Sequence, residues 1–457
     1  MNYLNFIFDN ITFFINKKQL FIKLYRKVIE LDCYPILDIS SPTLYNCRMA
    51  YNSIFRKITL FFIIGILLIS SLYSCASANP AIPESKDIEA SNINTSPNTT
   101  FIPPEPAVIN SETINFLPDS AHVKYLGRTL FIDDMLLMCY SSTGAEFNIK
   151  AKRLDITITG NSSSEARIAV FVNGERMLDE MVLSKSQTFT VFDGKQTVEG
   201  LVRVIKVSEA TSSLAAISKI TLDKDGVISP AAEKKLKIEF IGDSITCGYG
   251  VDDLDRNHHF KTSTEDNTKT YAYKTSANLD ADYSMVSVSG WGIISGYSSN
   301  GTKQASSQLP KYYDRLAVAW TNLCGVDPKA IKWDFSSFIP NVIVVNLGTN
   351  DSSYTKGNSE KITEYKIAYI DFLKDIRAKN PDAAIICSLG IMGQDLCGAV
   401  EETVNEYSSL SGDTNVFYLK FDNQKMGDGI AADWHPSEKT HEKAADLLTA
   451  KIRELIK

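Results

Sequence analysis

Residues 237–250 read KIEFIGDSITCGYG, and this stretch decides the class of the C-terminal fold. An apolar run ends at Gly242, and the chain then presents one small hydroxyl side chain, Ser244, on a glycine-rich turn. Mostly apolar runs recur at residues 283–288, 341–347, 383–389 and 416–419. Continuous runs of this kind are typical of a parallel sheet that is covered on both faces. The sequence therefore predicts such a sheet.

Helical periodicity separates the apolar runs. Residues 360–378 carry one apolar stripe, and the C-terminal segment carries another, made of Ala444, Ala445, Leu448, Ile452 and Leu455. Spacings of three and four residues place such side chains on one face of a helix. Strands that alternate with helices over residues 234–457 predict one α/β domain with a doubly wound parallel sheet.

Residues 107–230 have a different pattern. Short runs alternate apolar and polar side chains, and Asn-Gly and Asp-Gly pairs mark turns between them. This pattern predicts an all-β sandwich without long helices. A small sandwich beside an enzyme either binds carbohydrate or packs against the catalytic domain and completes its cleft, and the sequence leaves both roles open.

The N-terminal region indicates export. Residues 58–74 are apolar, follow Arg56-Lys57 and end before Cys75, as in a secretory signal. Leu72-Tyr73-Ser74-Cys75 resembles a bacterial lipoprotein box, which implies that Cys75 is acylated after cleavage. A single transmembrane anchor is the alternative, although these 17 residues are short for a full span. We interpret residues 1–75 as an upstream extension with a lipoprotein signal peptide, in which Met49 is an alternative start.

Pro, Ser, Asn and Thr dominate residues 76–106, which predicts a disordered linker. The expected location is the cell surface, with membrane contact only through the lipid at Cys75; secretion is the alternative. The formal net charge of −7 disfavours nucleic acid as a partner. The cysteines after Cys75 show no spacing typical of a metal site, and a Cys387–Cys397 disulfide remains open.

Four short motifs stand at predicted strand ends or before the last helix. Ser244 follows the first strand of the α/β domain, and Ser289-Gly290-Trp291-Gly292 follows the second. Asn350 lies in a Gly-Thr-Asn-Asp motif, and His435 lies in Asp433-Trp434-His435-Pro436. Ligands of open parallel sheets sit at the carboxyl ends of the strands, so these residues are expected to share one site.

In this order the four motifs resemble the conserved blocks of the SGNH, or GDSL-type, hydrolases. The resemblance covers residues 236–457 and implies a three-layer, flavodoxin-like α/β domain. The preceding sandwich, with the run CYSSTGAEFNIKAK at residues 139–152, further resembles carbohydrate esterase family 2. The resemblance implies a jelly-roll domain followed by a carboxylic ester hydrolase that removes acetyl groups from plant polysaccharides without a metal or another cofactor.

The family's chemistry implies a role for each motif. Ser244 would attack the acyl carbonyl after His435 takes its proton, which gives an acyl-enzyme. The oxyanion would be held by the backbone N–H groups of Ser244 and Gly290, or Gly292 instead, and by the side chain of Asn350. Asp433 would orient His435, although some members use a main-chain carbonyl. We expect Asp243 and Asp351 to organise loops.

The aromatic residues beside these motifs are candidates for the substrate surface. Trp434 and Trp291 are expected to contact sugar rings, although tryptophan is also a common core residue. The predicted substrate is an acetylated polysaccharide or oligosaccharide such as xylan or glucomannan, and we expect a monomer. The alternatives are a broad aryl or lipid esterase, and a carbohydrate-binding lipoprotein whose hydrolase domain is inactive.

Overall fold

The computed structural model describes residues 112–161, 165–183, 185–211 and 213–456, which all belong to one compact unit. The predicted signal peptide, the lipid-bearing Cys75 and the linker at 76–106 lie outside these residues. Among the described residues, no helix combines the length and the apolar character that a membrane span needs.

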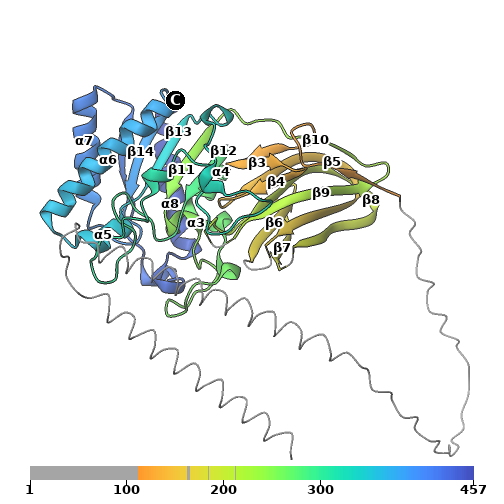
Figure 1. The fold of residues 1–457 in the computed structure, drawn as a ribbon, viewed down its shortest axis with the longest axis horizontal. Helices are drawn as coiled ribbons and strands as arrows, with labels where there is room; N and C mark the ends of the chain where they lie inside the picture. Colours follow the sequence, from red (N-terminus) through yellow and green to blue (C-terminus); the bar gives the residue numbers. More distant parts are fainter. Residues whose placement is uncertain (1–111, 162–164, 184, 212, 457) are drawn as a thin grey trace, which may run out of the picture. The chain divides into compact units, whose positions relative to one another are not determined.

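The N-terminal half of the described chain is an antiparallel β-sandwich, as predicted (Figure 1). Its main path runs β3-β4-β9-β5-β8-β6-β7, with β1 on β9 and with β2 and β10 on β5. Alternating side chains of the two longest strands, β5 and β8, enter a core that includes Phe147, Ile156 and Val204. The strands are β1 (Thr113–Phe116), β2 (Lys124–Leu126), β3 (Thr129–Ile132), β4 (Met135–Met138), β5 (Thr143–Gly160), β6 (Ala166–Val172), β7 (Glu175–Val182), β8 (Ser186–Lys206), β9 (Ala215–Asp223) and β10 (Val227–Pro230).

The C-terminal half is the predicted parallel α/β domain. Five strands lie in the order β12-β11-β13-β14-β15, and every neighbouring pair is parallel. The first strand of the domain, β11, thus lies inside the sheet. The chain places β12 on one side of β11 and then adds β13, β14 and β15 on the other side. The strands are β11 (Lys237–Gly242), β12 (Asp282–Ser287), β13 (Val342–Asn346), β14 (Ala384–Leu389) and β15 (Val416–Lys420).

Helices cover both faces of this sheet, which explains the continuous apolar runs. Ile343 and Val345 of β13 belong to the core beneath α6 and α7, whereas Val342 and Val344 belong to the core beneath α4 and α8. Alternate residues of one strand therefore meet opposite helical layers. The helices are α3 (Ser244–Cys247), α4 (Tyr271–Asn278), α5 (Thr349–Thr355), α6 (Ser359–Lys379), α7 (Cys397–Ser411) and α8 (Glu438–Leu455).

The sandwich and the α/β domain share a core. Leu137, Tyr140 and Leu214 of the sandwich belong to the same buried cluster as Ile241 and Val286 of the parallel sheet. A fully buried ion pair joins the domains as well, because Nη2 of Arg128 lies 3.3 Å from the Glu239 carboxylate. Nη1 of the same guanidinium donates to the carbonyls of Tyr313 and Arg315. The sandwich is therefore packed into the hydrolase domain.

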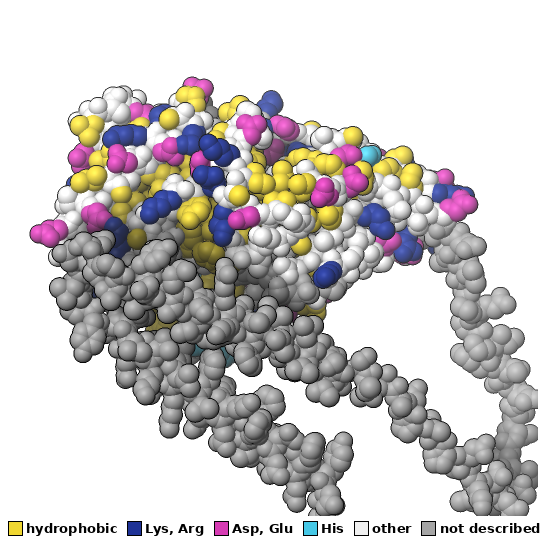
Figure 2. Space-filling view, viewed as in Figure 1, with side chains coloured by type: hydrophobic (Ala, Val, Ile, Leu, Met, Phe, Trp, Pro, Cys, Tyr) yellow, Lys and Arg dark blue, Asp and Glu magenta, His cyan; other side chains and the backbone are white. Residues whose placement is uncertain are grey.

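Charges of both signs are interspersed on the face shown in Figure 2, where Lys and Arg side chains lie among Asp and Glu side chains. The five described cysteines, Cys139, Cys247, Cys324, Cys387 and Cys397, are all free thiols. The Cys387–Cys397 disulfide that the sequence left open is absent from the described structure. Cys387 lies inside strand β14, and Cys397 is the first residue of α7.

Candidate active site

Ser244 stands where strand β11 changes into the single turn of α3. Asp243 caps this turn, because its carboxylate accepts the backbone N–H of Ile245 at 3.0 Å. Gly242 is required here, since a Cβ at this position would lie 2.0 Å from Oγ1 of Thr246. The tight connection places the Ser244 hydroxyl at the carboxyl end of a central strand, in the position predicted for a nucleophile.

His435 lies next to Ser244, with Nε2 2.8 Å from the serine Oγ. Its other ring nitrogen, Nδ1, lies 3.2 Å from the carbonyl oxygen of Ala432. A carbonyl only accepts hydrogen bonds, so this contact assigns the proton to Nδ1 and leaves Nε2 free to take the serine proton. Burial lowers the pKa of His435 to about 4, although the Ala432 carbonyl opposes this shift. The imidazole of His435 is therefore neutral at pH 7, and only the neutral imidazole can accept a proton.

A strained turn creates this geometry. Asp433 and Trp434 have φ values of 49° and 65°, the left-handed region that residues with a Cβ seldom adopt. The turn is closed by backbone bonds from His435 N–H to the Ala432 carbonyl and from Ala431 N–H to the His435 carbonyl. Backbone strain of this kind is often concentrated at functional sites. Here it bends the chain so that a carbonyl faces the imidazole.

The prediction that the Asp433 carboxylate orients His435 is wrong for this geometry. The left-handed turn points the carboxylate to the other side, where it accepts the Tyr249 hydroxyl at 2.9 Å and the Phe260 N–H at 2.9 Å. Nδ1 of His259 lies 2.8 Å from the same carboxylate. Burial alone would raise the pKa of Asp433, but the bonds from His259, Tyr249 and Phe260 lower it below its ordinary value.

Asp433 instead reaches His435 through an aromatic stack. The Tyr249 ring lies against the imidazole with centroids 4.0 Å apart, and the Phe260 ring lies 4.3 Å from that of Tyr249. Burial raises the pKa of Tyr249, as does the neighbouring Asp433 carboxylate, so the phenol keeps the proton that it donates. The phenol is thus held between the acid and the base.

The backbone N–H groups of Ser244 and Gly290 have no hydrogen-bond partner among the described residues. Gly290 has φ 77°, and a Cβ there would meet open space. The N–H of Gly292 instead donates to the Ser307 carbonyl at 3.2 Å. The geometry therefore favours Gly290 over Gly292 as an oxyanion donor.

Asn350 brings its side-chain amide to the same place. Its Nδ2 lies 2.8 Å from the Trp291 carbonyl and 3.3 Å from the Asp243 carboxylate, and Asn350 lines the cleft with Ser244 and Gly290. These contacts fix the amide plane. Burial raises the pKa of Asp243 to about 7, although the bond from Ile245 N–H opposes this shift. Through its two carboxylate oxygens, Asp243 contacts both the Ser244 turn and the Asn350 amide.

Asp351 fixes the loop that carries Gly290. Its carboxylate accepts the backbone N–H groups of Ile293, Ile294 and Ser295 at 2.8 to 3.0 Å. Burial raises its pKa to about 6, against the lowering effect of these three bonds. Asp243 and Asp351 thus have the loop-organising contacts that the sequence predicts.

The site opens into a cleft of about 610 Å³. Trp434 and Tyr297 present exposed rings to it, with 52% and 63% of their surface accessible. Trp291, the other predicted substrate contact, is only 4% exposed and packs against Tyr312 and Trp320. The prediction for Trp291 is therefore wrong, because its backbone faces the site while its ring enters the core.

Comparison with protein families divides the chain at the same point as the fold. Residues 240–443 match the GDSL-like Lipase/Acylhydrolase family, and residues 125–231 match the Carbohydrate esterase 2 N-terminal family. The chain carries a GDSL-type hydrolase domain and, before it, a carbohydrate esterase 2 N-terminal domain. The resemblance on which the sequence analysis rested is thus confirmed.

Curated relatives of the chain include cellulase/esterase CelE of Acetivibrio thermocellus, 32% identical over 343 residues. That alignment covers 73% of this chain but 40% of CelE, so the chain spans less than half of this relative. An acetylxylan esterase/glucomannan deacetylase of Cellvibrio japonicus is 25% identical over 76% of this chain and 92% of its own length.

Solved structures of family 2 esterases have the same fold. The acetyl xylan esterase Est2A of Butyrivibrio proteoclasticus matches with a TM-score of 0.69 and 27% identity, over 76% of this chain and 98% of Est2A. A family two carbohydrate esterase of Clostridium thermocellum in complex with cellohexaose matches with a TM-score of 0.63 and 29% identity, over 73% of this chain and 99% of that one.

Three residues at the site of this esterase were not singled out as contacts by the sequence. His259 and Phe260 meet Asp433 from a loop far away in the chain, and Tyr297 lines the cleft beyond the Gly290 loop. No local motif marks any of them. An aromatic residue soon after Ser289-Gly290-Trp291-Gly292 is the one available signal, and it applies to Tyr297.

Proposed function

We propose that the protein is an exported serine esterase that removes O-acetyl groups from plant cell-wall polysaccharides such as acetylated xylan or glucomannan. The observation that carries this proposal is the 2.8 Å contact between Ser244 Oγ and His435 Nε2 beside two unpaired backbone N–H groups. An ester carbonyl placed there meets a base-activated hydroxyl and donors for the oxyanion.

In the proposed reaction His435 Nε2 takes the Ser244 proton as Oγ attacks the acetyl carbonyl. The N–H groups of Ser244 and Gly290 bind the oxyanion of the tetrahedral intermediate. The Asn350 amide joins them by exchanging its longer bond, the 3.3 Å contact with the Asp243 carboxylate, for the oxyanion. One such donor typically contributes about 3 kcal/mol to transition-state stabilisation. His435 then gives its proton to the departing sugar oxygen, and the resulting acyl-enzyme is cleaved by water that His435 activates in turn.

The cleft supports a carbohydrate bearing a short acyl group. The exposed rings of Trp434 and Tyr297 offer flat apolar faces of the kind that stack on sugars. Among the described residues that line the cleft, Met392 is the one apolar side chain that is not aromatic, beside Thr349, Ser352 and Ser353. A long acyl chain would therefore meet few aliphatic side chains, whereas an acetyl group needs few. The names of the Cellvibrio japonicus and Butyrivibrio proteoclasticus relatives agree with this substrate class.

Export belongs to the same proposal. Residues 58–74 followed by Cys75 have the sequence pattern of a lipoprotein signal, and a polymer of the plant cell wall is met only outside the cell. Labelling cells with a radioactive or clickable fatty acid tests the anchor. Incorporation that is lost in Cys75→Ala supports it, and equal incorporation in both proteins contradicts it.

Acetate release from a panel of acetylated polysaccharides tests the reaction. We expect the wild type to release acetate from xylan or glucomannan and Ser244→Ala to release none above background. A long-chain nitrophenyl ester cleaved faster than the acetate would favour a lipid esterase instead. Polysaccharide binding without any acetate release would identify a carbohydrate-binding protein with an inactive hydrolase domain.

A further inference from the structure

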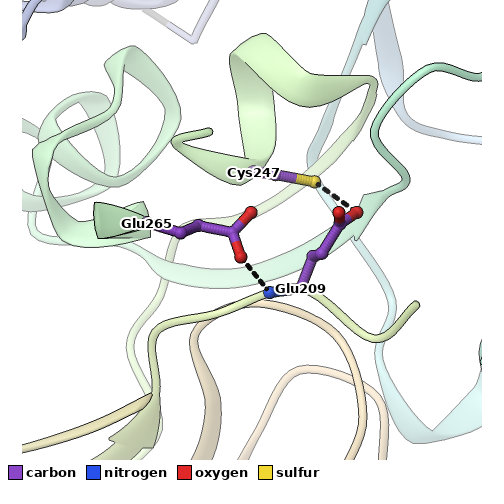
Figure 3. A group of neighbouring side chains, drawn as sticks. All are labelled: Glu209, Cys247 and Glu265. Atoms are coloured by element: carbon purple, nitrogen blue, oxygen red, sulfur yellow. Dashed lines mark hydrogen bonds between the residues drawn. The ribbon is translucent and has the colours of Figure 1, made fainter. Parts of the chain in front are cut away.

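A buried group of ionisable side chains lies behind the site, where the sandwich meets the α/β domain. It consists of Glu209 from the loop between β8 and β9, Cys247 at the end of α3, and Glu265 (Figure 3). Glu209 is 3% exposed, and the other two are fully buried. None of them lines the cleft, so the reaction proposed above makes no direct use of them.

Glu209 touches the two segments that carry the candidate nucleophile and oxyanion donor. Its carboxylate accepts the backbone N–H of Ser289 at 2.8 Å, and Ser289 immediately precedes Gly290. The same oxygen lies 3.6 Å from Sγ of Cys247, the last residue of the helical turn that begins with Ser244. One carboxylate from the sandwich thus holds both segments from behind.

Glu209 is itself held on every side. Its backbone N–H donates to the Glu265 carboxylate at 2.8 Å, and its carbonyl accepts the ammonium group of Lys206 at 3.0 Å. Two residues earlier, the Val207 carbonyl accepts the N–H of Asn267 at 3.1 Å. The fully buried Lys206 also supplies positive charge to a cluster of two carboxyl groups. With its backbone fixed in this way, Glu209 can transmit the sandwich's position to the Gly290 loop through the bond of its carboxylate with the Ser289 N–H.

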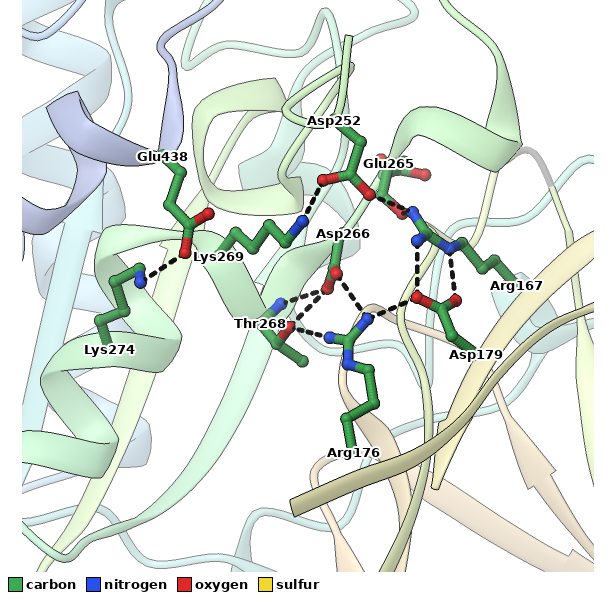
Figure 4. A network of polar contacts seen from close by, with 10 residues as sticks. All are labelled: Arg167, Arg176, Asp179, Asp252, Glu265, Asp266, Thr268, Lys269, Lys274 and Glu438. Carbon is green, nitrogen blue, oxygen red and sulfur yellow. Dashed lines mark hydrogen bonds and ion pairs between the residues drawn. The ribbon is translucent and has the colours of Figure 1, made fainter. Parts of the chain in front are cut away.

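A second network anchors the segment that contains Glu265. Arg167 of β6 binds Asp252 at 2.6 Å, Arg176 of β7 binds Asp266 at 2.8 Å, and both arginines share Asp179 (Figure 4). These pairs are partly shielded from solvent, and Arg167, Arg176 and Asp252 each contact two opposite charges. The segment beside Glu209 is therefore tied to two sandwich strands.

We propose that Glu209 is a positioning residue of the oxyanion hole, through which the sandwich sets the orientation of the Gly290 N–H. The inference rests on the proposed serine esterase chemistry. It also assigns the sandwich a role, since a domain that supplies this carboxylate is part of the active-site architecture. Catalytic groups held slightly out of place lose much of their effect, because a misplacement of about 1 Å can lower turnover by about 100-fold.

The variants Glu209→Ala and Glu209→Gln test this proposal with 4-nitrophenyl acetate as substrate. Glu209→Ala should lower kcat about tenfold or more and leave KM within about twofold, since the oxyanion hole acts in the transition state. Glu209→Gln keeps a side-chain oxygen that can accept the Ser289 N–H, so it should retain most of the wild-type kcat. Glu199→Ala is the matched control, because Glu199 lies on the sandwich with a side chain that is 71% exposed.

The rate constant of inactivation by diethyl 4-nitrophenyl phosphate distinguishes a damaged oxyanion hole from a loss of folded protein. Phosphorylation of Ser244 by this reagent also develops negative charge on an oxygen in the oxyanion hole. The rate constant of inactivation should therefore fall together with kcat in Glu209→Ala. Both values are divided by the folded fraction of the variant, which circular dichroism measures. Unchanged kcat in Glu209→Ala overturns the proposal, as does an equal loss in Glu209→Gln. If Glu209→Ala does not fold, Glu209→Gln is compared with Ser289→Pro, which removes this N–H together with the serine hydroxyl, also fixes φ, and should lower kcat.

Two further outcomes are separable. A wild type without esterase activity refutes the proposed function, whereas an active wild type matched by both Glu209 variants refutes only this inference. The oxygen and sulfur atoms of Glu209, Cys247 and Glu265 lie within 4.8 Å of one another, as ligands of a metal would. If the purified wild type contains one equivalent of metal and Glu209→Gln does not, Glu209 is a metal ligand. That result would overturn the proposal.

Discussion

The imidazole ring of His435 is stacked on the phenol ring of Tyr249, with centroids 4.0 Å apart and planes inclined by 25°. The hydroxyl of Tyr249 donates to Asp433, whose carboxylate is turned away from the imidazole. The base is therefore oriented at its Nδ1 edge by the Ala432 carbonyl and across its face by Tyr249. The Asp433 carboxylate therefore positions the imidazole through the Tyr249 ring.

Replacing Tyr249 separates the contribution of the ring from that of the hydroxyl. Tyr249→Ala removes the surface against which His435 lies, so kcat should fall about tenfold or more as the imidazole gains freedom. Tyr249→Phe keeps the stack and loses only the bond to Asp433, so it should stay within about fivefold of the wild type. Steady-state kinetics with an aryl acetate measures both. Equal losses in the two variants would contradict a role for the stack.

Asp433→Ala tests whether the main-chain carbonyl is sufficient to orient the base. Where an acid orients a catalytic histidine directly, its replacement costs about 10⁴-fold in kcat. Here the Ala432 carbonyl remains in place, so we expect a loss below about 100-fold, from the freed Tyr249 ring. His435→Ala serves as the reference for complete loss of the base. A loss in Asp433→Ala as deep as in His435→Ala would show that the carboxylate is needed in some other way.

The layers of the fold were predictable because their signals are local. The apolar run at 341–347 is strand β13 (Val342–Asn346), and the stripe within 360–378 is helix α6 (Ser359–Lys379). Each face of the sheet is covered by helices, so strand residues are apolar throughout. Helix α7 (Cys397–Ser411) was missed, although Val400, Val404 and Tyr407 form a buried stripe at helical spacing.

The site was predictable as far as its motifs extend. Ser244, Gly290, Asn350 and His435 converge as the sequence indicates, because each follows a strand of one parallel sheet or precedes the last helix. The contact of Asp433 was not predictable, since it depends on left-handed backbone at two residues without glycine. The contacts of Glu209 depend on how two domains pack, and no local pattern reports that.

The pH dependence of turnover should reflect the low pKa of His435, which burial lowers to about 4. The base is active only when neutral, so kcat/KM should stay level from pH 7 down to about pH 5 and then fall as His435 becomes protonated. An acidic limb near the ordinary histidine pKa of about 6.5 would contradict this. Acetate release at a series of pH values, measured by enzymatic assay after quenching, gives the profile.

Unfolding in acid must be separated from this limb. The pKa values of His435 and the buried His441 are lowered in the folded protein, to about 4 and about 3, mainly by burial. At these two histidines the unfolded chain binds more protons below about pH 6.5, which lowers the free energy of unfolding as the pH falls. The raised pKa values of the Asp243 and Asp351 carboxyl groups act in the opposite direction over the same range. Circular dichroism at each pH, followed by an assay after return to pH 7, shows whether the lost activity is reversible titration.

Two alanine substitutions in the same loop should have opposite consequences. A Cβ on Gly292 would lie 2.3 Å from the Ser295 carbonyl and 2.4 Å from the Asp351 carboxylate, so Gly292→Ala should destabilise the protein by about 2 kcal/mol. A Cβ on Gly290 meets nothing, but its φ of 77° should make Gly290→Ala shift the backbone, with about 1 kcal/mol of strain. We therefore expect Gly290→Ala to fold and to lose kcat.

Thermal unfolding and kinetics on both variants check this pair. The expected pattern is a clear drop in Tm for Gly292→Ala and a drop in kcat of about tenfold for Gly290→Ala, since one displaced oxyanion donor has effects of at least that size. A fully active Gly290→Ala would remove this N–H from the oxyanion hole. An unchanged Tm in Gly292→Ala would mean that the Asp351 side chain can move away from the new Cβ and still keep its bonds to the N–H groups of residues 293–295.

Trp434 should matter for polymers and little for small esters. The Arg256 guanidinium lies 4.5 Å from the ring centroid on one side, and the ring is 52% exposed to the cleft. Trp434→Ala should therefore raise KM for an acetylated polysaccharide about tenfold, equivalent to about 1.4 kcal/mol, and change kcat/KM for 4-nitrophenyl acetate by less than about threefold. Trp320→Ala is the control, since Trp320 is 62% exposed and does not line the cleft. Equal effects of Trp434→Ala on both substrates would mean that the ring supports His435 and does not bind sugar.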